Sequence, residues 1–214
     1  MSNCMKKTIF SFILLLVGVG MVNAQTAKQY LDKVYSKYQN AQTYYIKFNF
    51  EHQNKGNAQT KTGEVFSAKQ KFNLNVDDVN QIYDGKKLYT VAKDDKEVMI
   101  SSATNTDDFL TPTKVLSSYK TGYSYALDKK QTIGGKSIQF IKLTPTQQNA
   151  AMKYSVLGIN TKNNEIYSYQ EFAKDGSKTT ITVKEYLENL IIHKDYFNFD
   201  QKKYKSKGYI VTQL

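Results

Sequence analysis

The chain has 214 residues, a formal net charge of +11, one cysteine and no tryptophan. All of its basic side chains are lysines, and lysine lacks the planar guanidinium fork that reads bases and clamps phosphates. We therefore interpret the positive charge as a solvated surface with at most weak attraction to anionic membranes, and we expect no nucleic-acid partner. Cys4 lies in a segment that we expect to be removed, so disulfides, thiolate metal sites and cysteine nucleophiles are excluded from the rest of the chain.

Residues 1–24 have the pattern of a secretory signal peptide. Lys6 and Lys7 precede an apolar run, and small residues lead to a cleavage site expected after Ala24. The apolar stretch of about 15 residues is shorter than the roughly 20 that a membrane span needs, although an uncleaved anchor is the alternative. Because the remaining chain has no cysteine, we expect a bacterial periplasm as its location, with residues 25–214 forming one domain.

The first element after the signal is predicted to be a helix over residues 26–40. One face of this helix is apolar and aromatic: it carries Tyr30, Leu31, Val34, Tyr35 and Tyr38. From residue 43 the period changes to two, which is typical of strands that have one apolar and one polar face. This alternation predicts strands at residues 44–51, 63–66, 71–76, 79–83, 88–92 and 97–101.

A second helix is predicted over residues 107–119, because Thr111 can cap it and Pro112 then occupies its first turn. Alternation resumes beyond it and predicts strands at residues 123–127, 137–143, 153–159, 165–172 and 179–183. Two short pieces, 196–199 and 209–211, are interpreted as edge strands. Consecutive strands and two amphipathic helices indicate an α+β fold: one strongly curved antiparallel sheet, with the helices forming a lid over its concave apolar face.

Catalytic and metal-binding patterns are absent from the sequence. His52 and His193 have no second ligand at a metal-binding spacing, and Ser124 lies in a strand without the helix that a nucleophile elbow requires. Gly134-Gly135-Lys136 lacks the spacing of a phosphate loop and is interpreted as a turn. We therefore expect no enzyme activity and no cofactor.

Several stretches follow one another in an order known from another family. The most specific is Tyr83-Asp84-Gly85-Lys86-Lys87-Leu88-Tyr89, which is similar to Ser-Asp-Gly-Lys-x-Leu-Trp of that family. Others are Gly63-Glu64-Val65-Phe66, Phe72-Asn73-Leu74, Leu143-Thr144-Pro145, the hairpin of residues 172–180 and Phe197-Asn198-Phe199. Across residues 27–212 the chain thus resembles the periplasmic outer-membrane lipoprotein carriers of the LolA type.

The resemblance implies an incomplete antiparallel β-barrel whose open side is closed by helices. It also implies a monomeric chaperone that receives lipoproteins from an inner-membrane ABC transporter, shields their acyl chains and delivers them to the outer membrane, to an acceptor where one exists. Carried onto this chain, the acyl cavity and its lid comprise Leu31, Val34, Ile46, Phe48, Phe50, Phe66, Phe72, Leu74, Leu88 and Tyr89.

One departure and three alternatives accompany this hypothesis. The well-studied members have an arginine after the glycine-led strand that latches the lid, whereas this chain reads Ser67-Ala68-Lys69-Gln70-Lys71 and offers only Lys69. The main alternative is a periplasmic binder of a free lipid or another hydrophobic small molecule on the same fold. An enzyme that acts on an acyl substrate lacks a visible nucleophile–base pair, and an envelope interaction module would require a completely packed inner face.

Overall fold

The computed structural model describes residues 26–102, 116–117, 119–147 and 149–214. The signal peptide predicted for residues 1–24, and most of the helix predicted for 107–119, lie outside this part of the chain. Residues 26–40 form a helix, as predicted. The other elements are β1 (Thr43–Asn54), β2 (Asn57–Ala68), β3 (Lys71–Val76), β4 (Val79–Tyr83), β5 (Lys87–Ala92), β6 (Glu97–Ser102), β7 (Tyr123–Ile133), β8 (Lys136–Pro145), β9 (Met152–Asn160), β10 (Glu165–Ala173), β11 (Lys178–Glu188), α3 (Gln201–Ser206) and β12 (Ile210–Gln213).

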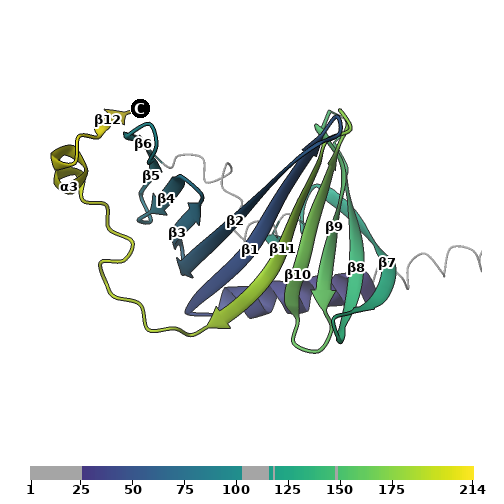
Figure 1. The fold of residues 1–214 in the computed structure, drawn as a ribbon. Helices are drawn as coiled ribbons and strands as arrows, with labels where there is room; N and C mark the ends of the chain where they lie inside the picture. The colour runs from purple at the N-terminus through teal and green to yellow at the C-terminus, as the bar shows by residue number, and fades with distance from the viewer. Residues whose placement is uncertain (1–25, 103–115, 118, 148) are drawn as a thin grey trace, which may run out of the picture.

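The strands form one open sheet in the order β12-β6-β5-β4-β3-β2-β1-β11-β10-β9-β8-β7 (Figure 1). Neighbouring strands are antiparallel, with one departure from the prediction: β12 adds to β6 in parallel. β7 and β12 stand at opposite ends of this order, so the sheet does not close. Register shifts in β1, β7 and β10 bend the strands, because a bulge increases local twist. The predicted open, curved sheet is confirmed.

Two predicted turns have the backbone that their sequences require. Asp84 accepts hydrogen bonds on Oδ1 from the backbone N–H groups of Lys86 (2.7 Å) and Lys87 (2.8 Å), and Gly85 adopts φ +96°. Gly134 and Gly135 both have positive φ, at 55° and 76°, which suits the tight hairpin between β7 and β8. These turns fix the register of the strands on either side.

The inner face of the sheet carries the main apolar cluster. The helix of residues 26–40 crosses this face over the half formed by β1 and β7–β11 (Figure 1). Ala27, Leu31, Val34 and Tyr38 recur at helical spacing and are almost completely buried. They belong to one cluster with Ile141, Leu143, Leu157, Ile159 and Ile166 of β8, β9 and β10, so the helix and the sheet share a core.

The outer face of β3–β6 is covered by a different segment, which we call the C-terminal strap (residues 189–214). Phe199 of the strap stacks on Tyr89 at 4.5 Å between ring centroids, next to the buried cluster of Val91, Val98 and Ile100. Residues 194–197 form a turn, so the strand predicted at 196–199 is wrong, whereas the piece predicted at 209–211 is β12. The helix α3 between them was not predicted.

Candidate functional site

The inner face brings together most of the residues assigned from the sequence. Leu31 and Val34 come from the helix of residues 26–40, and the strands supply the others from the same face: Ile46, Phe48, Phe50, Phe72, Leu74 and Leu88. Alternation explains the arrangement, because every second residue of β1 points the same way and its partners on β2 and β3 follow the antiparallel register. These eight side chains form a continuous apolar surface.

Phe66 and Tyr89 lie on the outer face instead. Phe66 packs against Tyr45 (4.5 Å between centroids) and Tyr196 (5.0 Å), and Tyr89 stacks on Phe199 of the strap. In both strands the apolar residue follows another apolar residue, Val65 or Leu88, so the sequence does not reveal which of the two points inward. We therefore leave Phe66 and Tyr89 out of the candidate site.

Gly63 shapes the inner face opposite β1. A Cβ atom at this position would lie 2.7 Å from Cε2 of Phe48 and 3.0 Å from Cγ2 of Val76. The missing side chain lets the Phe48 ring lie against the backbone of β2. A glycine is therefore needed at this position of β2 for packing, because its backbone torsions would suit other residues.

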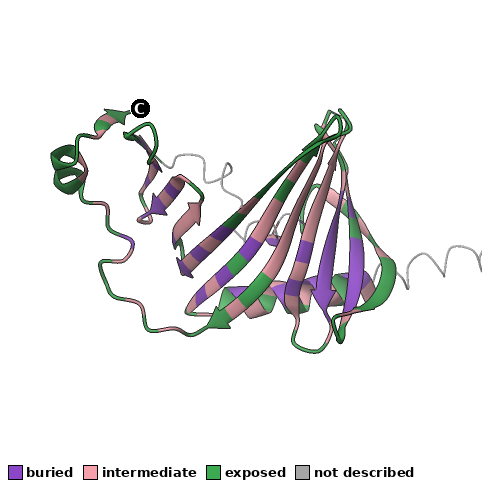
Figure 2. Ribbon diagram, viewed as in Figure 1, coloured by how far each residue is buried: buried purple, intermediate pink, exposed green. Residues whose placement is uncertain are grey.

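Part of the inner face remains half-exposed. Phe50, Leu74, Val76, Ile181 and Val183 come from β1, β3 and β11, and they pack against the main cluster without being buried by it. Figure 2 shows the change from buried to intermediate exposure along these strands. A row of large half-exposed apolar side chains on a concave surface is a candidate contact surface for a hydrocarbon chain.

Among the described residues, a small cavity lies under the helix. A cavity of about 10 Å³ lies between Leu31 and the strands, and it is lined by Leu116, Tyr119, Tyr123, Leu143, Ser155, Leu157 and Tyr169. That volume is about what one water molecule needs. This cavity is too small to take a hydrocarbon tail while the helix keeps its present position.

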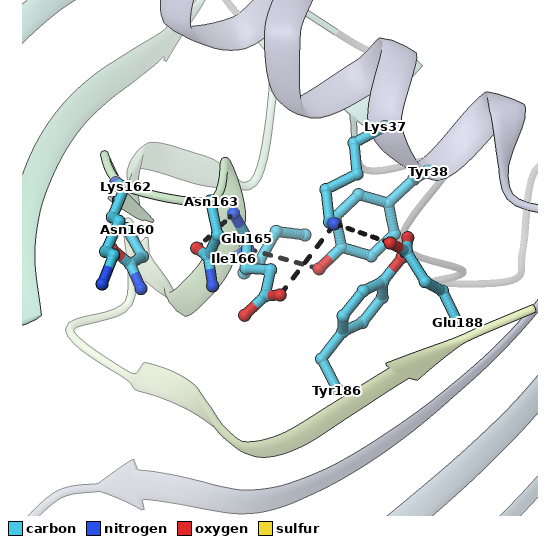
Figure 3. Close-up of polar contacts among 9 residues, drawn as sticks. All are labelled: Lys37, Tyr38, Asn160, Lys162, Asn163, Glu165, Ile166, Tyr186 and Glu188. Carbon is cyan, nitrogen blue, oxygen red and sulfur yellow. Dashed lines mark hydrogen bonds and ion pairs between the residues drawn. The ribbon is translucent and has the colours of Figure 1, made fainter.

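Polar contacts hold the C-terminal end of the helix to β10 and β11 (Figure 3). Lys37 Nζ lies 3.1 Å from Glu188 Oε1 and 3.9 Å from Glu165 Oε1, while Tyr186 donates a hydrogen bond to Glu188 Oε2 (2.9 Å). The Tyr38 hydroxyl accepts a hydrogen bond from the backbone N–H of Ile166 (3.2 Å). The contacts of Lys37 and Tyr38 join residues more than 120 positions apart, so no local sequence pattern indicates them.

The middle of the helix contacts the segment before β7. Asp32 accepts hydrogen bonds from the Tyr119 hydroxyl (2.5 Å) and from Lys28 Nζ (2.7 Å). The Tyr119 ring packs edge-on against Tyr35, with the centroids 6.3 Å apart. Lys120 Nζ lies 3.5 Å from the centroid of Tyr35, on a face of that ring. The helix is therefore fastened in its middle and at its C-terminal end by charged and aromatic side chains.

Both carboxylates at these fastenings titrate below their ordinary range. Burial alone would raise the pKa of Glu188, but the hydrogen bonds from Tyr186 and Lys37 and the charge of Lys37 outweigh it and lower the pKa. At Asp32, burial would also raise the pKa, but the hydrogen bonds from Lys28 and Tyr119 outweigh this effect and the pKa is lowered. Both groups are therefore ionised at neutral pH, and the contacts are complete there.

Lys69 is exposed in the turn between β2 and β3, where its φ is +54°. Lys37, which lies on the helix, forms ion pairs with Glu165 and Glu188 that join the helix to β10 and β11. Among the described residues, no group of three or more histidine, aspartate or glutamate side chains could hold a metal ion. In the same part of the chain, no helix has the length and apolar character to cross a membrane.

Known proteins resemble this chain in fold. No protein-family model and no curated protein sequence matches it. The solved structure of an uncharacterized conserved protein from Thermus thermophilus aligns with a TM-score of 0.60 at 9% identity, covering 88% of this chain and 99% of that one. This likeness shows that the open sheet with its helix is an established fold.

Two solved structures with more informative descriptions align less closely. A putative outer membrane lipoprotein-sorting protein domain from Vibrio parahaemolyticus has a TM-score of 0.45 at 9% identity, covering 82% of this chain and 97% of that one. A LolA superfamily protein from Nitrosomonas europaea has a TM-score of 0.42 at 10% identity, covering 81% and 97%. These two alignments show a loose likeness of fold and say nothing about the function of this chain.

Proposed function

We propose that the protein is a periplasmic carrier that binds the acyl chains of lipoproteins on the concave face of the sheet and carries them from the inner to the outer membrane. The observation that carries the proposal is the apolar inner face, which extends beyond the helix as the half-exposed row of Phe50, Leu74, Val76, Ile181 and Val183. A water-soluble domain that keeps such a row on a concave surface can shield an apolar ligand.

The helix of residues 26–40 acts as the lid in this proposal. Burying one methylene contributes about 0.8 kcal/mol, so a tail of about 15 methylenes gains on the order of 12 kcal/mol. A carrier must offset most of the cost of taking this tail out of a membrane and must still release it. In the closed form, Leu31 and Val34 occupy the inner face that a tail would cover. Their displacement opposes binding and lowers the net affinity into a range that allows transfer.

The partners follow from the same proposal. The carrier would receive its cargo from an inner-membrane lipoprotein-releasing ABC transporter and pass it to an outer-membrane acceptor where one exists, and it would act as a monomer. The family resemblance in the sequence supports these assignments, and depletion of the protein in cells tests them. Lipoproteins should then accumulate in the inner membrane, and an unchanged distribution would contradict the carrier role.

The bound cargo can be identified directly. The protein should be purified from a membrane-rich extract without detergent and its bound molecules analysed by mass spectrometry. We expect co-purified lipoprotein. Free lipid in its place would assign the site to a lipid binder and overturn the lipoprotein proposal, and protein that takes up neither would contradict both.

A cross-link tests whether the helix has to move. Residues 25–214 contain no cysteine, so Lys37→Cys and Glu188→Cys provide the only thiols there, at two positions whose native side chains form an ion pair of 3.1 Å. A short bismaleimide should join them and prevent uptake of a fluorescent lipopeptide. Each single-cysteine variant treated with the same reagent is the control and should still bind. Equal uptake by the bridged protein would contradict the lid.

A further inference from the structure

The outer face of β7–β11 carries an open hollow, which we call the outer hollow. Its volume is about 580 Å³, within the range of roughly 300–1,000 Å³ that is usual for small-molecule sites. Phe140 and Val156 line this hollow and share a small cluster of their own. The residues that follow them, Ile141 and Leu157, belong to the main inner cluster. Alternation therefore places the outer hollow on the face opposite to the helix of residues 26–40.

Most of the surface that the outer hollow exposes is polar. Phe140 and Val156 are almost completely buried, whereas Gln131 is exposed and Gln170 and Thr182 are half-exposed. Amide and hydroxyl side chains can both donate and accept hydrogen bonds. The backbones of β8, β9 and β10 are paired with one another, so an extended peptide cannot add there as a strand. A ligand of the outer hollow is therefore held by side chains and needs many polar groups of its own.

Two lysines give the outer hollow its charge. Lys129 and Lys142 line it together with one acid, Asp128. Lys142 Nζ lies 4.4 Å from the ring centroid of Tyr154, and Lys129 Nζ lies 5.5 Å from that of Phe140. None of the ion pairs among the described residues includes either lysine. The aromatic rings thus hold two ammonium groups that have no carboxylate partner in the described part of the protein.

A ladder of side chains across β8–β11 adds a third lysine at the border of the outer hollow. Tyr154 pairs with Phe172, and their rings stack with the centroids 4.5 Å apart. Phe172 pairs in turn with Lys178, whose Nζ lies 5.3 Å from the ring centroid. Glu171, beside Phe172, points to the inner face by alternation. Because Lys142 and Lys178 flank the stacked rings from the neighbouring strands, a planar base finds no free ring face on this ladder.

We propose that the outer hollow binds a short oligosaccharide whose sugars carry carboxylate groups. The carboxylates pair with Lys129 and Lys142, the two cations that lack a protein partner. The sugar hydroxyls exchange hydrogen bonds with Gln131, Gln170 and Thr182. A ligand rich in phosphate is favoured by arginine forks, whereas the basic side chains of this chain are all lysines. The inference concerns a second site and does not rest on what the concave face carries.

Isothermal titration calorimetry tests the site with two trisaccharides, trigalacturonate, which carries carboxylates, and maltotriose, which is neutral. Wild type should bind trigalacturonate about tenfold more tightly than maltotriose, because charge-assisted hydrogen bonds are the stronger ones. Added salt should weaken the binding of trigalacturonate only. No binding of trigalacturonate, or equal binding of both sugars, would overturn the proposal. Displacement of trigalacturonate by an equal concentration of inorganic phosphate would also overturn it, because the lysines would then bind any anion.

A pair of double variants separates the position of the charges from their number. Lys129→Gln with Lys142→Gln should lower the affinity for trigalacturonate about tenfold and bring it close to that for maltotriose. Lys202→Gln with Lys205→Gln removes the same charge from exposed positions on α3, outside the outer hollow, and should leave the affinity almost unchanged. Equal losses in the two variants would contradict the site, because binding would then reflect net charge alone.

A change of charge without a change of shape provides a second test. Gln170→Glu places a carboxylate in the outer hollow and should weaken trigalacturonate binding about tenfold by repulsion, with an unchanged melting temperature. Gln59→Glu makes the same change at an exposed position on β2 and should have no effect. An affinity that Gln170→Glu leaves intact would show that the sugar does not enter the outer hollow.

Acidic sugars occur in soluble glycans and as head groups of glycolipids, and vesicles distinguish these sources. The protein should be sedimented with phosphatidylcholine vesicles that contain or lack glucuronosyl diacylglycerol. Co-sedimentation that the variant with Lys129→Gln and Lys142→Gln loses would support the site with a glycolipid head group as its ligand. Binding of trigalacturonate without co-sedimentation would support the site with a soluble glycan. Co-sedimentation that this variant retains in full would overturn the assignment of a glycolipid head group to the outer hollow.

Discussion

The helix of residues 26–40 and the C-terminal strap both cover the sheet, but they cover opposite faces and are held differently. The helix contributes no strand and joins the sheet through its apolar face and through side-chain contacts such as that of Lys37 with Glu188. The strap adds β12 to the edge of the sheet and stacks Phe199 between Tyr89 and Tyr204. Removing the helix would leave the strand ladder intact, whereas removing the strap would take away one strand.

This difference explains why, of these two described segments, the helix rather than the strap suits the lid that we propose. A lid must leave and return without unfolding the protein, so its contacts must be ones that side chains alone can remake. The helix meets this requirement, and the hydrocarbon surface beneath it is the one that a ligand would use. The strap instead fixes the shape of the β3–β6 half, and with it the positions of Phe72 and Leu74 on the inner face.

The largest effect is expected from Leu31→Ala. Leu31 is 1% exposed and lines the small cavity under the helix, so the truncation should lower the free energy of unfolding by about 2–4 kcal/mol. Urea denaturation measures this loss. Hydrogen exchange should show faster opening of the helix at residues 26–40, with little change in β5, β6 and β12. Equal acceleration in those strands would show that the two regions open together.

The reciprocal change is Phe199→Ala in the strap. It removes the ring between Tyr89 and Tyr204 and should cost about 1.5–3 kcal/mol, because the ring is only half-buried. A lysine-specific protease should then cut faster between Lys202 and Lys207. Uptake of an acyl probe should stay within twofold of wild type, and a loss of uptake as large as that from a helix variant would contradict the separation of the two regions.

Two glycines allow a sharper comparison of the inner and outer faces. A Cβ at Gly63 would crowd Phe48 on the inner face, and a Cβ at Gly158 would lie 2.8 Å from Ser168 Oγ and 2.9 Å from Phe140 Cε1 on the outer face. Gly63→Ala and Gly158→Ala should each destabilise the protein by about 1–3 kcal/mol through overpacking. Only Gly63→Ala should change the affinity for an acyl probe, as measured by fluorescence titration. Equal changes in affinity would argue that the probe does not contact Phe48.

Local patterns predicted most elements because each strand alternates and each turn has its own residues. The helix face with Leu31 and Val34 and the strands from β1 to β11 were recognisable in this way. The strap was harder, because Phe197-Asn198-Phe199 alternates like a strand, although Tyr196 and Phe199 pack as single rings on Phe66 and Tyr89 of the outer face. Only the tertiary context distinguishes these two uses of aromatic residues.

Sequence alternation predicted only part of the candidate site, for a related reason. Alternation identified Ile46, Phe48 and Phe50 as one face, but it could not orient Phe66 and Tyr89, which follow apolar neighbours. The fastening of the helix depends on Lys37, Glu165 and Glu188, which are far apart in the chain and lie in unremarkable polar stretches. Such contacts become visible only when the order β1-β11-β10 places the strands side by side.

The smallest effect is expected from acid. The pKa of Glu188 is lowered in the folded protein, so the contact with Lys37 stabilises the fold fully above the ordinary glutamate value of 4.5 and is lost as the pH falls through the lowered value. Lys37→Met removes this pH-dependent contribution to stability. Between pH 6 and pH 3 the variant should lose about 0.5 kcal/mol less stability than wild type, because the pair is partly exposed.

Lys61→Met is the matched control for this pH dependence, because Lys61 forms an ion pair with Asp77 (3.3 Å) away from the helix. Urea denaturation at the two pH values measures the stability, and hydrogen exchange locates the change. In wild type, acid should open residues 26–40 before β5, β6 and β12, and Lys37→Met should show this opening already at pH 6. If Lys61→Met did so equally, the helix would not be held by its own ion pair, and the distinction between a lid fastened by side chains and a strap fastened by a strand would fail.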